Sequence, residues 1–446
     1  MIIRGGTIIT GDGHTIIPEA HIVIRGERIV DVGPGFGPDI EGEEAIDALN
    51  QLVIPGIINT HAHACAPGPF TPVAGPARTM EQVRIQQHRH LLGGETTVLH
   101  LCGFCLQREV DLIRDWPLRV KVGTSHLPSA LKAAQTVDGR GLSGAHCACT
   151  VHQRLVEGAA VIGEIGAGHT LGGGGQDYQL IPQVIQRASG VWLGPDQARE
   201  LKWAVLGKHL QREAFDRQRA EQCLRSSGLS AKLTVSEVQT LICDSVLPPL
   251  HEALRGFEEA AAASAETGSP AVIHNCPLAA PEIARLSQKY PGARLIAAHS
   301  NQADFEIHEA VQWSKRLRDL GVIVDVSTWD SPGKALHADP EKFITMIREG
   351  VVDTVSTDYA GGEWEPILKG LAMAVKAGAV SLAGAVAFAT GNVARLLPEV
   401  ATDRGLIAPG KMADLVLVEK EDVSRVIGVL VKGTFAARNG QIISPD

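Results

Sequence analysis

The sequence predicts an α/β protein, with a (β/α)8 TIM barrel and a small β-sandwich domain built from both termini. The first observation is that the middle of the 446-residue chain alternates short β-like apolar runs with stretches rich in Ala, Leu and charged residues. Strands that alternate with helices indicate a parallel sheet, and eight such units close a barrel. The second observation is that both ends of the chain lack this alternation and show β-branched runs separated by glycine-containing turns.

The two ends of the chain share a pattern of short antiparallel strands. Their β-branched runs stand at 7–9, 21–24, 28–32, 413–418 and 426–431. Asn439-Gly440 is a pair typical of two-residue hairpin turns. We therefore expect residues 1–57 and 400–446 to pair into one composite β-sandwich.

Residues 58–399 are expected to form the barrel. Candidate strands lie near 53–60, 95–102, 119–126, 160–165, 271–276, 294–299, 321–328 and 353–358. Helical patterns between them include 79–92, 280–289, 303–319 and 340–349. A barrel of this kind takes about 250 residues, so this region also has room for an elaboration.

One connection is much longer than a single strand–helix unit needs. About 105 residues separate the fourth and fifth candidate strands, and the stretch 195–265 is mostly helical in pattern. We interpret 172–265 as a helical insertion that serves as an oligomer contact, a cover for the barrel mouth or a surface elaboration. The glycine run Gly172 to Gly175 at its start is either a hinge or a simple loop.

Composition excludes several classes of protein. The net charge is -9 and the pI is about 6.0, which argues against a nucleic-acid-binding protein. No apolar run is long enough to span a bilayer, and the first residues do not read as a signal peptide. The eight cysteines follow no disulfide framework. We expect free thiols, a cytoplasmic location and a small-molecule substrate, with no nucleic acid and no membrane as partner.

Six side chains of metal-ligand type stand at or just past the ends of the candidate strands. They are His61, His63, Glu164, His274, His299 and Asp358. Imidazoles and carboxylates are ligands that borderline divalent metals prefer. Residues at the carboxyl ends of parallel barrel strands converge at one mouth. The sequence therefore predicts a binuclear metal centre.

Each ligand type has a distinct expected use. His61 and His63 are two residues apart on a strand, so both imidazoles face the same side and can bind one ion. Glu164 has two oxygens and can bridge two cations, while His274 and His299 resemble a second pair. We expect two divalent ions about 3.5–4 Å apart to share a hydroxide that attacks a carbonyl carbon. Asp358 would act as general base and then as general acid toward the leaving nitrogen.

Other residues near the expected mouth are weaker candidates. His126 is a candidate catalytic residue that polarises the substrate carbonyl, or else a supporting histidine. His100, Asn301, Trp329 and Tyr359 are candidate substrate contacts. The Cys102-Gly-Phe-Cys105 motif lacks a thioredoxin-like context, so redox chemistry is not inferred from it.

The motifs of this chain resemble the amidohydrolase superfamily over nearly its whole length. The resemblance is carried by Pro55-Gly-Ile-Ile-Asn-Thr-His-Ala-His63, by Gly94-Glu-Thr-Thr-Val98, by Ala389-Thr-Gly-Asn-Val-Ala394 and by Gly405-Leu-Ile-Ala-Pro-Gly-Lys-Met-Ala-Asp-Leu415. Within the superfamily the chain is most similar to the enamidases, through Gly163-Glu-Ile-Gly166, Ile273-His-Asn275, Ala298-His-Ser-Asn301 and Thr357-Asp358.

This resemblance implies a ligand set and a reaction. It implies Glu164 as the bridging ligand, with His61, His63 and Asp358 on one metal and His274 and His299 on the other. Zinc is the expected metal, with iron or manganese as alternatives. The implied reaction is hydrolysis of a C–N bond in a small cyclic amide, lactam, imide or enamide by a homo-oligomer, a dimer or tetramer. The 172–265 insertion has no counterpart in the enamidases, so the substrate stays open.

Two other functions remain as alternatives. The first is a mononuclear metal-dependent deaminase of a heterocyclic amine on the same fold. Relatives of that kind carry a glutamate three residues after the fifth-strand histidine, where this chain has Pro277. The second is a non-catalytic barrel scaffold, which the retention of all six ligand-type residues disfavours.

Overall fold

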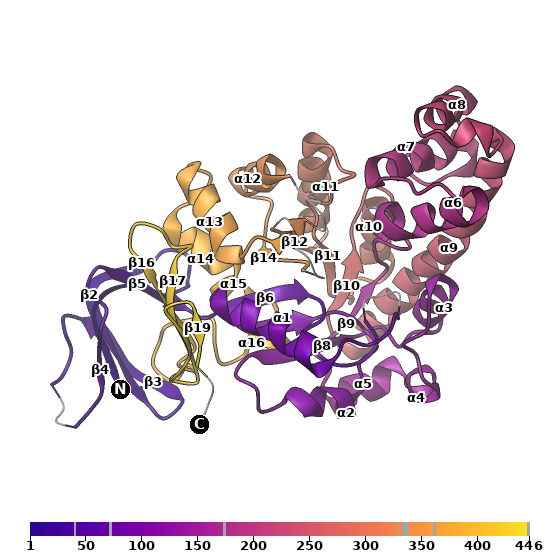
Figure 1. Cartoon of the computed structure of the whole chain (residues 1–446). Helices are drawn as coiled ribbons and strands as arrows, with labels where there is room; N and C mark the ends of the chain where they lie inside the picture. Colours follow the sequence, from indigo (N-terminus) through magenta and orange to yellow (C-terminus); the bar gives the residue numbers. More distant parts are fainter. Residues whose placement is uncertain are drawn as a thin grey trace.

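The expected barrel stands at the centre of the molecule (Figure 1). The computed structural model describes residues 1–39, 42–70, 74–172, 175–328, 330–331, 339–359 and 363–443. The barrel strands are β6 (Ile57–Ala62), β7 (Glu95–His100), β8 (Arg119–Thr124), β9 (Val161–Ile165), β10 (Ala271–His274), β11 (Leu295–Ala298), β12 (Ile323–Ser327) and β14 (Thr354–Ser356). They pair in parallel in the order β14-β12-β11-β10-β9-β8-β7-β6. Each overlaps one of the strands expected from the sequence.

The barrel closes between β6 and β14 through backbone contacts just past the end of β14. The Asp358 amide donates to the His61 carbonyl oxygen at 2.9 Å, and the His63 amide donates to the Tyr359 carbonyl oxygen at 2.8 Å. Ala62 and Tyr359 form an isolated parallel bridge. The carboxyl ends of all eight strands therefore meet at one rim, where side chains from distant parts of the sequence face one another.

Helices cover the outside of the barrel. They are α1 (Met80–Leu92), α2 (Gln107–Val110), α3 (Pro128–Val137), α4 (Gly144–Ala148), α5 (Val151–Glu157), α10 (Ala279–Lys289), α11 (Ile307–Asp319), α12 (Pro340–Arg348), α13 (Ile367–Lys376), α14 (Leu382–Phe388), α15 (Gly391–Leu396) and α16 (Pro398–Ala401). A capping box opens α1: the Thr79 hydroxyl accepts the Gln82 amide, and the Gln82 side chain accepts the Thr79 amide. The minor strands β13 (Asp330–Ser331) and β15 (Glu363–Trp364) pair with each other. Among the described helices, none is long and apolar enough to cross a membrane.

Strands from both termini form the second sheet. They are β1 (Ile2–Ile9), β2 (Ile16–Arg25), β3 (Arg28–Pro34), β4 (Ala45–Asp47), β5 (Gln51–Pro55), β16 (Leu415–Glu419), β17 (Val426–Val431), β18 (Thr434–Arg438) and β19 (Gln441–Ile442). The two chain ends join where β5 pairs with β16. Strands that are distant in the sheet, such as β2 and β17, contribute to one core through Ile22 and Leu430, so the sheet folds around its own apolar face.

A buried ion pair explains the most specific C-terminal motif. Arg404 is almost fully buried, and its Nη1 lies 2.7 Å from Asp414 Oδ2. Asp414 Oδ1 accepts the Lys432 amide at 2.8 Å, which fixes the turn that follows β17. Both charges are therefore paired where the chain re-enters the terminal sheet. The domain limits at 57 and 400 stay predictions.

Helices α6 (Ile181–Ser189), α7 (Pro195–Leu206), α8 (Arg217–Ser226) and α9 (Val235–Thr267) lie between β9 and β10, at the end of the molecule opposite the terminal sheet (Figure 1). Hydrogen bonds and an ion pair join α9 to α3. Glu259 accepts the Ser129 hydroxyl at 2.6 Å, and Glu252 lies 2.6 Å from Lys132 Nζ. The insertion is thus docked on the barrel rather than extended into solvent. Its proposed limits, 172–265, stay a prediction.

Candidate metal centre

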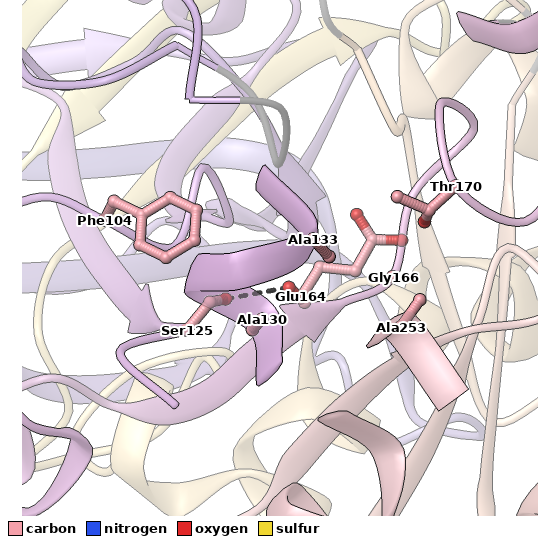
Figure 2. Close-up of a pocket in the computed structure, with 8 residues that line it drawn as sticks. All are labelled: Phe104, Ser125, Ala130, Ala133, Glu164, Gly166, Thr170 and Ala253. Carbon is pink, nitrogen blue, oxygen red and sulfur yellow. Dashed lines mark hydrogen bonds between the residues drawn. The ribbon is translucent and has the colours of Figure 1, made fainter. Parts of the chain in front are cut away.

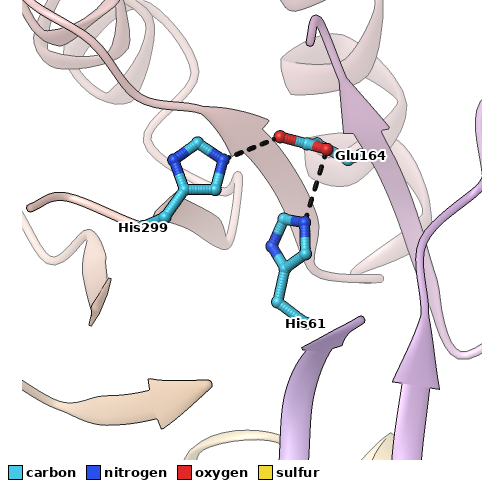
Figure 3. Close-up of side chains that lie close together, drawn as sticks. All are labelled: His61, Glu164 and His299. Carbon is cyan, nitrogen blue, oxygen red and sulfur yellow. Dashed lines mark hydrogen bonds and ion pairs between the residues drawn. The ribbon is translucent and has the colours of Figure 1, made fainter. Parts of the chain in front are cut away.

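Glu164 lies between imidazoles that reach it from three other strands. Its Oε1 lies 3.0 Å from His274 Nδ1 and 3.0 Å from His299 Nε2. Its Oε2 lies 3.4 Å from His61 Nε2 and 3.8 Å from His63 Nε2. Figure 3 shows His299 next to one oxygen of the Glu164 carboxylate and His61 next to the other. One oxygen of Glu164 therefore faces each pair of histidines.

Asp358 completes one side of this arrangement. Its Oδ1 lies 3.4 Å from His61 Nε2 and 3.3 Å from His63 Nε2. Within the described ranges, two groups have ligand atoms within 4.8 Å of one another: His61 with Glu164 and His299, and His61 with His63 and Asp358. We call His61, His63 and Asp358 the Asp358 side, and His274 and His299 the His274 side. The structure brings all six candidate ligands together.

The backbone at these positions adopts conformations that ordinary side chains rarely take. Asp358 has a φ of 51° and His299 a φ of 34°. Such conformations cost about 1–3 kcal/mol each and cluster at functional sites. Gly163 has a φ of 116°, and a Cβ there would stand 2.4 Å from the Val272 carbonyl oxygen. Only glycine lets β9 approach β10 this closely immediately before Glu164.

The buried side chain of Asn59 supports the Asp358 side through hydrogen bonds. Asn59 Oδ1 accepts the backbone amides of His61 at 3.1 Å and Thr357 at 3.2 Å. Asn59 Nδ2 donates to Glu95 Oε2 at 3.0 Å and to Thr357 Oγ1 at 2.8 Å. Asn59 thereby ties β6 to the segment that carries Asp358. Asn59 stands in the motif that runs from Pro55 to His63, so the sequence could have pointed to this residue.

A second buried carboxylate, Asp325, lies on β12 beneath the site. It accepts hydroxyl hydrogen bonds from Thr60 at 2.9 Å, Thr354 at 2.7 Å and Ser356 at 2.6 Å. Burial raises the pKa of Asp325, and the hydroxyls only partly offset that effect. Sequence reasoning missed this residue, because an aspartate within a strand carries no motif.

The electrostatics favour positive charge at the centre. Burial raises the pKa of Glu164, but the charge of His61 and the hydrogen bonds of His274 and His299 outweigh it and hold the pKa well below its usual range. Burial lowers the pKa of His63, yet Asp358 and Cys102 raise it to about 10. Burial and the neighbouring His299 lower the pKa of His274. The ionised carboxylates of buried Glu164 and partly exposed Asp358 thus favour cationic partners.

The residues fit divalent metal ions. His61 Nε2 lies 3.4 Å from an oxygen of Glu164 and of Asp358 but makes no hydrogen bond within the described part of the chain, and His61 Nδ1 and His274 Nε2 are likewise buried there without one. Buried imidazole nitrogens left in that state are costly unless a further group binds them. The donor set of imidazole nitrogen and carboxylate oxygen suits zinc, iron and manganese. The identity and number of ions stay predictions.

A small pocket adjoins Glu164 (Figure 2). Its lining includes Phe104, Ser125, Gly166 and Thr170, and three alanines: Ala130 and Ala133 of α3 and Ala253 of α9. Ser125 Oγ donates to the Glu164 carbonyl oxygen at 2.8 Å. The insertion therefore shapes this pocket directly, through Ala253.

The candidate substrate contacts that the structure describes bond to or contact other residues of the protein. Asn301 Nδ2 donates to the Ser327 carbonyl oxygen at 2.8 Å, and its Oδ1 accepts the Ser327 amide at 3.0 Å. The Tyr359 hydroxyl bonds to Arg89 of α1. His100 contacts Cys105, with 3.4 Å between Nε2 and Sγ. Their roles as substrate contacts stay predictions, and Trp329 lies outside the described residues.

His126 has contacts of a different kind from the six ligands. Its Nδ1 lies 3.0 Å from Thr124 Oγ1, and its ring stands edge-on to Phe104, a residue that lines the pocket. Burial, followed by the charges of Arg154 and His146, lowers the pKa of His126 to about 4. The ring is therefore neutral at pH 7. Its catalytic role stays a prediction.

Sequence reasoning also missed a buried ionic cluster beside the loops that follow β9 and β11. Lys202 of α7 is fully buried, and its Nζ lies 2.7 Å from Asp177 Oδ1. Arg199 Nε lies 2.9 Å from Asp177 Oδ2 and 3.9 Å from Asp304 Oδ1. Asp304 follows His299 by five residues. The cluster thus ties the insertion to a loop that carries a candidate ligand.

Comparisons with known proteins agree with the fold. A model of the amidohydrolase family matches residues 255–438. The β-aspartyl dipeptidase of Fervidobacterium islandicum AW-1 is similar in structure, with a TM-score of 0.59 and 14% identity, over 100% of this chain and 98% of that chain. A D-aminoacylase is similar with a TM-score of 0.61 and 14% identity, over 100% and 98%. Residues 255–438 therefore match the amidohydrolase family, and the whole chain has the fold of these structures.

Relatives found by sequence are similar to this chain only over short segments. A 5-methylthioadenosine/S-adenosylhomocysteine deaminase of Symbiobacterium thermophilum is 41% identical over 66 residues, which is 14% of this chain and 15% of that protein. The match therefore spans about one-seventh of the deaminase and carries no substrate to this chain. At 14% identity the structural likenesses likewise show the fold alone. The likeness to the enamidases stays a prediction.

Proposed function

We propose that this protein uses two divalent metal ions, zinc in the first instance, to hydrolyse a C–N bond in a small cyclic amide, lactam, imide or enamide. One observation carries the proposal: the two oxygens of Glu164 face different histidine pairs, with His274 and His299 at Oε1 and His61 and His63 at Oε2. A carboxylate that bridges two ions must present one oxygen to the ligands of each ion. The alanine walls of the adjoining pocket support a small substrate.

The chain's own residues have separable roles in this reaction. His61, His63 and Asp358 would hold one ion, His274 and His299 the other, with Glu164 between them. When bound, such ions lower the pKa of a water molecule and polarise a carbonyl group. The pKa of Asp358 is low, since His299, His63 and His61 outweigh the effect of burial, so its carboxylate is ionised at pH 7. Its side chain is 39% exposed, which lets Oδ2 reach substrate or water.

Asp358 moves the proton in this proposal. Its carboxylate accepts a proton from the attacking water and returns that proton to the nitrogen that leaves when the C–N bond breaks. Oδ1 faces His61 and His63, so the ligand and proton-transfer functions fall on different oxygens of one side chain. When the ring C–N bond of a small cyclic amide breaks, the ring opens and both ends stay in one molecule. The reaction then gives a single product.

A second candidate is hydrolysis of an open-chain amide. The observation that favours it is the similarity over the full length of the chain to structures described as a β-aspartyl dipeptidase and a D-aminoacylase. The deaminase alternative is weaker, because Pro277 occupies the position where such relatives carry a glutamate and Glu164 would then have no use.

The test combines metal content with product analysis. Elemental analysis of protein purified without added metal should give close to two ions per chain, and Glu164→Gln should give one or none. Glu213→Gln, at an exposed glutamate of the insertion, is the matched control and should keep both ions. One ion in both the parent and Glu164→Gln would contradict the bridge and favour a deaminase. Cyclic and open-chain amides, assayed with the same samples, separate the two hydrolase candidates. A location in the cytoplasm and a dimeric or tetrameric state stay predictions.

A further inference from the structure

Three buried cysteines adjoin the Asp358 side. Cys65, Cys102 and Cys105 are each no more than 1% exposed. The Cys65 amide donates to His100 Nδ1 at 3.2 Å, so the His100 proton stands on Nε2, which faces Cys105 Sγ at 3.4 Å. Hydrogen bonds thus fix the tautomer of His100. The reaction proposed above uses none of these thiols.

Cys102 contacts the candidate metal ligand His63 at the ring nitrogen that faces away from Asp358. Its Sγ lies 3.8 Å from His63 Nδ1, while His63 Nε2 lies 3.3 Å from Asp358 Oδ1. The two ring nitrogens of His63 therefore face different groups, a sulfur and a carboxylate. An ion bound at Nε2 requires the ring proton to stand on Nδ1, because a neutral imidazole has one donor and one acceptor nitrogen.

We propose that Cys102 is a positioning residue: its sulfur accepts the Nδ1–H of His63 and so presents Nε2 to the metal ion of the Asp358 side. Metal-binding histidines almost always donate their second nitrogen to a carboxylate, a backbone carbonyl or water, and loss of that partner costs about 10–100-fold in metal affinity. Here a thiol takes the place of those oxygen acceptors. The inference rests on the proposed function, because it requires an ion at His63.

The geometry argues against Cys102 as a metal ligand in its own right. Among the residues that the structure describes, the groups of ligand atoms within 4.8 Å of one another contain His61, His63, Glu164, His299 and Asp358, and Cys102 belongs to neither group. Its sulfur contacts the ring nitrogen of His63 that points away from the carboxylates. Cys102 therefore acts on the ion through His63.

The experiment measures metal affinity by competition with a chelator, for Cys102→Ala, Cys102→Ser and the parent. Cys102→Ala should weaken the binding of one of the two ions by about 10–100-fold. Cys102→Ser keeps an acceptor at this position and should stay within about threefold of the parent. Cys243→Ala removes a buried thiol from the insertion and should leave both affinities unchanged. If Cys102→Ala does not fold, Cys102→Val removes the acceptor while filling the space.

The visible spectrum of bound Co²⁺ tests the positioning role directly, because it would not change if Cys102 only stabilised the fold. The visible spectrum of Co²⁺ bound to the parent should change in Cys102→Ala and be restored in Cys102→Ser. A sulfur-to-cobalt charge-transfer band in the parent, lost in Cys102→Ala, would overturn the proposal by making Cys102 a ligand.

The two hypotheses fail in different ways. A parent that binds two ions with an unaltered affinity in Cys102→Ala would overturn the positioning role and leave the proposed function standing. A parent that binds no divalent ion would overturn both.

Discussion

The two sides of Glu164 use similar imidazoles in different surroundings. On the His274 side, one carboxylate oxygen serves His274 and His299, both at 3.0 Å. On the Asp358 side, His61 and His63 share Glu164 Oε2 and also face Asp358 Oδ1. The Asp358 side thus has two carboxylates for two histidines, while the His274 side has one.

The difference predicts a division of labour. A second carboxylate strengthens the attraction for a divalent cation, and the partly exposed Asp358 side chain leaves that side open to substrate. The His274 side lies next to the insertion, whose Lys202 is buried beside the loops that follow β9 and β11. We infer that the Asp358 side performs proton transfer and that the His274 side mainly holds an ion in place.

Substitution of the two sides should have unequal effects. Asp358→Asn removes both a ligand charge and the proton acceptor, so kcat should fall about 10²–10⁴-fold even at saturating metal. His274→Asn should remove one ion per chain and cost less in kcat once metal is supplied in excess. Steady-state kinetics beside elemental analysis checks both variants. Equal losses in kcat would remove the distinction between the two sides.

The insertion should matter for the stability of the His274 side. Lys202→Met leaves Asp177 fully buried, with Arg199 as its remaining cation, and should lower the free energy of unfolding by about 3 kcal/mol. Lys202→Met combined with Asp177→Leu removes both charges and should recover most of that loss. Urea unfolding measures both variants. If the double variant is no more stable than the single one, the buried pair is not the cause.

Metal binding should strengthen as the pH rises. In the metal-free protein the pKa values of His63 and His299 are raised to about 10 and about 9, so both rings hold protons at pH 7. An ion must displace those protons, so between pH 7 and 9 the apparent affinity should rise about tenfold per pH unit for each proton released. Calorimetry in buffers of different ionisation enthalpy counts the protons. A metal affinity that does not change with pH would contradict the assignment of protonated His63 and His299 rings in the metal-free protein.

His126→Asn should have the smallest effect. The His126 ring contacts Thr124 and Phe104 rather than either side of Glu164, so we expect kcat to fall less than about tenfold. Groups that transfer protons directly contribute about 10²–10⁴-fold. A loss in that range, without loss of metal, would support the catalytic role that the sequence suggested.

Much of the fold could be predicted from the sequence because its signals are local. The alternation of apolar runs with helical patterns placed all eight barrel strands, and the motif around Asp414 placed the return of the chain into the terminal sheet. The candidate ligands were found for the same reason: a side chain at the end of a parallel strand faces the mouth whatever packs around it. Asp325 and Lys202 were missed, because each depends on partners far away in the sequence.

The sequence by itself therefore determined the architecture and the six residues that meet at the barrel mouth. Only the tertiary structure decided which oxygen of Glu164 faces which histidines, that Cys102 lies behind His63, and that α7 reaches the loop after His299. The physical reason is that strand periodicity fixes the direction of a side chain along its own strand. The choice of partner depends on rotamers, backbone conformations and packing that arise only when distant segments come together.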